Sequence, residues 1–97
     1  MGTDMIEGAC DCHVHVYSPG FALAPTATFR PPPAPASAYR EAQRRLGFTR
    51  VVVVQPTGYG FDNSCTLAAA AELGEGARGV ALVPPGVPDA VIALLPA

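Results

Sequence analysis

Residues 50–55 read RVVVVQ, and this stretch decides the fold class. Four consecutive valines without polar alternation are typical of a strand buried on both faces, as in a parallel sheet. Further strands are predicted upstream over residues 9–16, ACDCHVHV, and downstream over residues 78–83, RGVALV. Segments with helical patterns lie between them. This alternation predicts an α/β fold whose parallel strands are joined by right-handed crossovers.

The helices are predicted over residues 38–46 and 64–73, and residues 87–95 resemble the start of a third. Ser37 is a candidate N-cap for the first helix. Gly47 suits the left-handed position that ends it. The apolar face of this helix is expected to contain Tyr39, Ala42 and Leu46.

Residues 17–36, between the first strand and the first helix, are rich in proline. Proline lacks the amide N–H that a sheet needs, and it disfavours helix in the preceding residue. We therefore expect a long loop, in part polyproline II, on the active-site side of the sheet. Within it, Arg30 is a candidate to bind an anionic substrate, although a solvated arginine is the more common case.

Asp11, His13 and His15 alternate along the first predicted strand. Because alternate residues share a face, we expect these three together and Cys10 and Cys12 on the opposite face. Two neutral imidazoles at this spacing can bind one divalent metal, and Asp11 could orient one of them. The histidines could instead be ordinary surface residues of an edge strand. Their place near the C-terminal end of the first strand, where barrel active sites lie, favours a catalytic or metal-binding role.

The cysteines allow a second interpretation, a structural zinc site formed by Cys10, Cys12 and the two histidines. The expected alternation argues against it, because the thiols would face away from the imidazoles. Cys65 is expected to be a small buried residue. An odd number of cysteines, two of them one residue apart, does not form a disulfide framework. We therefore predict a reducing, cytoplasmic location.

Residues 56–62, PTGYGFD, leave the second strand at the same rim as the histidines. Thr57 and Tyr59 offer hydroxyls to a substrate, and the glycines allow the backbone to approach a ligand closely. The alternative is a glycine-rich turn in which Tyr59 only packs and Asp62 or Asn63 caps the next helix.

The composition excludes several classes of protein. The 97 residues form one partial domain, 49% hydrophobic with a net charge of −2. Only 14% of residues are charged, which is too apolar for a disordered chain. No basic cluster is long enough to follow a nucleic-acid backbone, so we expect no nucleic-acid partner. No stretch reaches the roughly 18 apolar residues of a membrane span, so we expect no membrane partner.

Residues 8–83 resemble the amidohydrolase superfamily. The resemblance depends on the segment GACDCHVHVYSPGFALAP and on the pattern RVVVVQP-x-x-YG-x-DN over residues 50–63, which is more specific to a lactonase-like branch. It implies the N-terminal three βα units of a (β/α)8 TIM barrel that hydrolyses a lactone or ester of a carboxylated substrate. His13 and His15 match the first-strand histidines, which in metal-using members bind zinc or manganese. Lactonases of this branch can work without a tightly bound metal.

The chain also departs from the family. A barrel has eight βα units in about 250 residues, whereas three strands are predicted here. The later histidine and aspartate of the family have no counterpart, so we expect a truncated chain that is inactive alone. Two alternatives stay open: a fragment of an amidohydrolase-type decarboxylase, and a small non-catalytic protein that binds metal through Cys10, Cys12, His13 and His15. The oligomeric state is not predicted.

Overall fold

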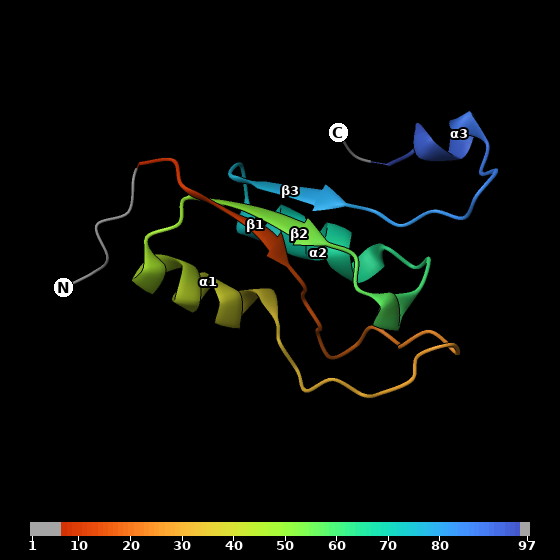
Figure 1. Ribbon diagram of the computed structural model, residues 1–97, viewed down its shortest axis with the longest axis horizontal. Helices are drawn as coiled ribbons and strands as arrows, with labels where there is room; N and C mark the ends of the chain where they lie inside the picture. The colour runs from red at the N-terminus through yellow and green to blue at the C-terminus, as the bar shows by residue number, and fades with distance from the viewer. Residues whose placement is uncertain (1–6, 96–97) are drawn as a thin grey trace.

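The computed structural model describes residues 7–95, which form one parallel sheet with the two longer helices on one side of it (Figure 1). The strands lie in the order β1-β2-β3, and both neighbouring pairs are parallel. This confirms the predicted α/β class. The elements are β1 (Cys10–Val14), α1 (Ala36–Leu46), β2 (Arg50–Val54), the 3-10 turn η1 (Thr57–Tyr59), α2 (Ser64–Leu73), β3 (Ala77–Val80) and α3 (Asp89–Ile92).

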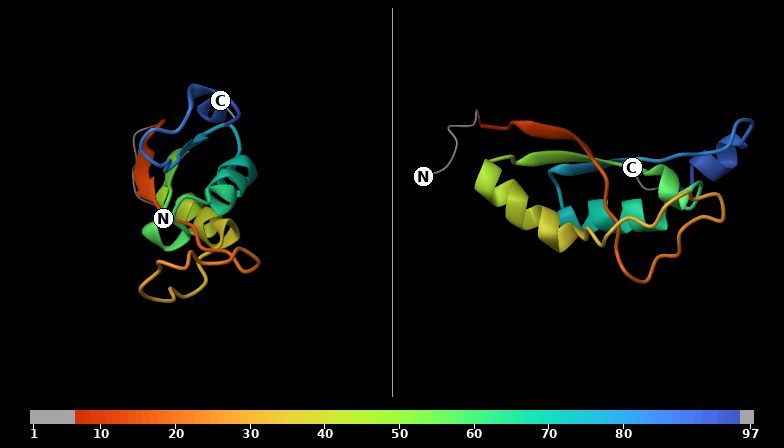
Figure 2. Two further views of the ribbon diagram at one scale, coloured as in Figure 1. Left: turned by 90° about the vertical axis from the view of Figure 1, so that its right-hand side faces the viewer. Right: turned by 60° about the horizontal axis from the view of Figure 1, so that its bottom comes forward.

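Helices α1 and α2 cover the same face of the sheet (Figure 2). Strands that are adjacent in sequence are also adjacent in space, so each right-handed crossover places its helix on the same side. This is the winding of a (β/α) barrel, whose interior lies on the face that the helices leave open. We call this second face the open face. Within residues 7–95, no helix is long and apolar enough to cross a membrane.

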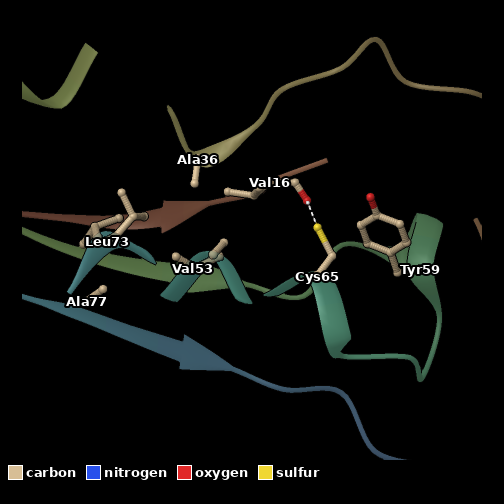
Figure 3. Close-up of a cluster of buried hydrophobic side chains, with 9 residues drawn as sticks. Val16, Ala36, Val53, Tyr59, Cys65, Leu73 and Ala77 are labelled. Atoms are coloured by element: carbon tan, nitrogen blue, oxygen red, sulfur yellow. Dashed lines mark hydrogen bonds between the residues drawn. The ribbon is translucent and has the colours of Figure 1, made fainter. Parts of the chain in front are cut away.

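The valines of β2 show how the two faces differ. Val51 and Val53 are buried at 1% and 0% exposure, whereas Val52 and Val54 are half-buried. The buried pair packs with Val16 of the chain after β1 and with residues of α2, among them Cys65, whose thiol donates to the Val16 carbonyl at 3.6 Å (Figure 3). The prediction that both faces of this strand are buried was therefore wrong for the face of Val52 and Val54, which is half-buried. Only the helix-covered face is closed among the described residues.

The first helix begins earlier than predicted. Pro35, not Ser37, occupies the N-cap position of α1, and Ser37 lies in the first turn. The Pro35 carbonyl accepts the N–H groups of Ala38 and Tyr39 at 3.1 and 3.2 Å, so the helix starts without a side-chain cap. Gly47 ends the helix as predicted, with a left-handed φ of 83°.

Other predicted boundaries were too generous. β1 and β3 end at Val14 and Val80, and α3 is a single turn. Leu46 of the predicted apolar face is 47% exposed. The proline-rich loop is more ordered than a free polyproline segment, because Tyr17 and Ala34 exchange two backbone hydrogen bonds of 3.0 and 2.7 Å across its base.

Gly76 offers a direct test of this packing. A Cβ atom there would lie 2.5 Å from the Thr49 carbonyl oxygen, whereas one at Gly79 would lie 3.8 Å from the Thr66 methyl group. We therefore expect Gly76→Ala to lower the free energy of unfolding by about 1–3 kcal/mol, as overpacking typically does. The control, Gly79→Ala, should have little effect. Urea unfolding of both variants measures this, and equal stability would contradict the packing described.

Candidate active site

A bulge in β1 decides where the site residues point. Asp11 pairs with Val51, and Val14 pairs with Val53, so three steps along β1 match two along β2. One extra residue therefore lies between Asp11 and Val14, which is the definition of a β-bulge. Since Val51 and Val53 are core residues on the helix-covered face, Asp11 and Val14 point to that face as well.

Asp11 does not share a face with the histidines, and that prediction was wrong. Its Oδ2 accepts a hydrogen bond from the Tyr39 hydroxyl of α1 at 2.9 Å, on the helix-covered face. Partial burial and then this carboxylate raise the pKa of Tyr39 above its ordinary value. The bulge breaks the period of two on which the prediction depended. Asp11 is therefore held by α1 and is not placed to orient an imidazole.

His13 and His15 lie together on the open face, as predicted. Val16 is fully buried in the core and Val14 packs against it, so the alternating imidazoles point the other way. Both histidines are exposed, and their ring centroids are 5.0 Å apart in an edge-to-face arrangement of 86°. The sequence alone identified this pair, because alternation is intact from His13 onward.

His15 also contacts β2. Its Nδ1 lies 2.9 Å from the Val54 carbonyl oxygen. Because a carbonyl only accepts hydrogen bonds, Nδ1 must carry the proton, and Nε2 of the neutral ring keeps a free lone pair. This nitrogen can bind a metal or accept a proton. Sequence spacing could not have shown the contact, because it joins residues 39 positions apart.

The cysteines do not complete a metal site within residues 7–95, where no group of three or more histidine, cysteine, aspartate or glutamate side chains could hold an ion. Cys12 donates its thiol to the Cys10 carbonyl at 3.6 Å. Partial burial and the Cys12 thiol raise the pKa of Cys10 above its ordinary value. The described residues thus offer a metal the two imidazoles, which fit as part of a ligand set.

Gln55, at the end of β2, organises the rim loop. It is buried, and its Nε2 donates to the carbonyls of Gly60 and Asp62 at 2.9 and 2.8 Å. Its Oε1 accepts the Thr66 hydroxyl at 2.5 Å. The first two bonds hold the loop after β2, and the third joins Gln55 to α2. Sequence reasoning missed this residue; the available signal was a single amide directly after a run of valines.

Tyr59 faces inward from the rim loop. It is 3% exposed, and its hydroxyl accepts the Ser18 N–H at 3.2 Å. Its ring lies 5.1 Å from that of Tyr17. Burial is the main cause that raises the pKa of Tyr59 to about 12, and a hydrogen bond with Cys65 is a smaller cause. Tyr59 therefore anchors the start of the proline-rich loop.

The remaining predicted substrate contacts are spread over the rim. Thr57 is exposed on η1, and Arg30 is exposed on the proline-rich loop. Arg30 and Tyr59 border one hollow of about 250 Å³, whose other lining residues are Tyr17, Ser18, Pro19, Phe21, Leu23, Pro31 and Pro33. The structure thus brings Arg30 and Tyr59 together, and the histidine pair lies outside this lining.

Asp62 and Asn63, the two candidate caps, have different roles. Asp62 Oδ1 accepts the N–H and the hydroxyl of Ser64 at 3.0 and 2.6 Å, and these bonds lower its pKa. Asp62 therefore holds the first residue of α2, whereas the N-cap position is Asn63, which makes no side-chain cap bond. The Asn63 amide instead exchanges two hydrogen bonds of 2.9 Å with the Leu82 backbone, which fixes the chain after β3.

The comparisons with known proteins agree with this architecture. The family model for amidohydrolases matches residues 10–96. The chain belongs to the amidohydrolase family. It is 41% identical over 85 residues to the 2-pyrone-4,6-dicarboxylate hydrolase of Comamonas testosteroni, covering 86% of this chain and 28% of that protein. It is 38% identical over 80 residues to the D-galactarolactone isomerase of Agrobacterium fabrum, covering 79% and 27%.

A solved structure extends the likeness to three dimensions. The crystal structure of a probable 2-pyrone-4,6-dicarboxylic acid hydrolase from Acinetobacter baumannii, with citric acid bound, superimposes with a TM-score of 0.83 at 25% identity. The match covers 91% of this amidohydrolase chain and 33% of that chain. The chain thus spans about a third or less of these relatives, and its fold is the N-terminal three βα units of their TIM barrel.

Gln55→Glu tests the rim. The carboxylate would face the Gly60 and Asp62 carbonyls without a proton to donate, so the free energy of unfolding should fall by about 3 kcal/mol at neutral pH. These neighbours raise the folded-state pKa of the new carboxyl. The loss should therefore be smallest below about pH 4.3, the ordinary glutamate value, and grow as pH rises above it.

Gln43→Glu on α1 is the matched control, because it makes the same chemical change on a half-buried helix residue. Urea unfolding of both variants between pH 3 and 8 provides the measurement. If Gln55→Glu followed Gln43→Glu at every pH, Gln55 would not hold the loop.

Proposed function

We propose that this chain supplies the first-strand histidines of a hydrolase active site that opens lactones or esters of carboxylated substrates. The observation that carries the proposal is the pair His13 and His15 on the open face, with Nε2 of His15 left free by its bond to Val54. The relatives support the reaction class. They are named as a dicarboxylate hydrolase, a lactone isomerase and, in Rhizobium radiobacter, a 4-sulfomuconolactone hydrolase 40% identical over 65 residues.

The histidines would act in one of two ways. The free Nε2 of His15 accepts a proton from an attacking water, as a general base does. Alternatively, His13 and His15 hold a divalent ion, zinc or manganese, which when bound lowers the pKa of water and polarises the substrate carbonyl. In either case the bond from Nδ1 to Val54 fixes the ring of His15, and the edge-to-face contact limits the orientation of His13.

The substrate would meet the rim loops. Arg30 borders a hollow at the start of the proline-rich loop, and a guanidinium there can pair with a carboxylate. Thr57 presents an exposed hydroxyl on η1, and Tyr59 forms the wall of the same hollow as Arg30. A carboxylated ligand agrees with the citric acid bound to the Acinetobacter relative.

A chimera tests the proposal. Residues 10–83 would replace the matching segment of the Comamonas hydrolase, and hydrolysis of 2-pyrone-4,6-dicarboxylate would be followed with and without added zinc or manganese. We expect turnover in the chimera and a fall in kcat/KM of at least about 100-fold in His13→Asn and in His15→Asn, the range for a lost acid–base or metal-binding group.

Arg40→Ala, on the exposed surface of α1 and away from the open face, is the control and should keep its activity. A folded chimera without turnover would count against the proposal, as would histidine variants that remain as active as the control.

A further inference from the structure

One hydrogen bond joins the helix layer to the strand that carries the histidines. The Tyr39 hydroxyl of α1 donates to Asp11 Oδ2 at 2.9 Å, and the pair is partly buried. The two residues are 28 positions apart, so the bond fixes long-range structure and not a local turn. Asp11 lies at the start of the β-bulge, because its partner is Val51 and the next matched pair is Val14 with Val53.

The bulge requires a reason for Asp11 to face α1. In a regular strand, Asp11 would share the open face with His13 and His15, where water would solvate its carboxylate. On the helix-covered face a carboxylate is unfavourable unless a donor satisfies it. Tyr39 supplies this donor, so the bulged register is the one in which Asp11 is satisfied on the helix side.

The bulge in turn sets the direction of His13. A bulge bends its strand and re-aims the side chains beside it, and His13 lies between the matched residues Asp11 and Val14. His15 is held separately by the Val54 carbonyl. The edge-to-face contact of the rings, with centroids 5.0 Å apart, therefore depends on where the bulge places His13.

We propose that Tyr39 is a positioning residue, which acts through Asp11 to hold the bulge in β1 and so keeps His13 against His15. Its importance for turnover rests on the proposed function. The effect of Tyr39 on the bulge and on the contact between the two rings does not depend on that function.

Nuclear Overhauser contacts between the ring protons of the two histidines test this in the 97-residue chain. Wild type should show them, because the ring centroids are 5.0 Å apart. Tyr39→Phe removes only the hydroxyl and should lose these contacts, while the contacts of Val16 with the core remain. Asp11→Leu should lose them as well. Asp11→Asn keeps an oxygen that accepts the Tyr39 hydroxyl and should retain them.

Arg40→Ala is the matched control on the same helix. It removes a hydrogen bond from Arg40 to the Glu72 carbonyl, which does not involve β1, and should leave the ring contacts unchanged. If Asp11→Leu fails to fold, the ring contacts in Tyr39→Phe alone test the proposal. Unchanged ring contacts in a folded Tyr39→Phe, or equal losses in Asp11→Asn and Asp11→Leu, would overturn the proposal. Because no turnover is measured, this failure is distinct from a failure of the chimera.

Discussion

The parallel pairing of β1 with β2, interrupted by one extra residue, is the constraint on which the rest of the site depends. The pairing places Val51 and Val53 under the helices and gives Val14 and Val16 the same direction. Because of the extra residue, Asp11 points toward the helices while the two histidines still point to the open face. The result is a strand with a carboxylate bound to α1 on one face and two imidazoles on the other.

A second set of contacts holds two loops together at the rim of the sheet: the proline-rich loop and the loop after β2. The proline-rich loop begins where Ser18 meets the Tyr59 hydroxyl, and its Ala24 N–H donates to the Gly58 carbonyl at 2.8 Å. At Gly58 a Cβ atom would lie 2.9 Å from the Tyr17 hydroxyl, so a larger residue there would displace the Tyr17 ring. With Gln55 holding the loop after β2, these bonds fix both loops at the C-terminal ends of the strands, where barrel active sites lie.

Much of this fold could be predicted from residue patterns. The valine run identified a parallel sheet, and alternation from His13 to Val16 placed the imidazoles on one face. These are local features, and local rules are enough for them. The face of Asp11 could not be predicted, because its reversal depends on a tyrosine 28 residues away. The roles of Gln55 and of the Val54 carbonyl were hidden for the same reason, since hydrogen bonds across the sheet and its loops leave no period in the sequence.

β2 fixes His15 so that its Nε2 is free on the open face of the sheet. Long-range ¹H–¹⁵N correlation of the histidine rings, at a pH where the rings are neutral, reads the tautomer directly. We expect His15 to be protonated at Nδ1, because its Nδ1 lies 2.9 Å from the Val54 carbonyl oxygen, which can only accept the proton. A neutral His15 protonated at Nε2 would contradict it.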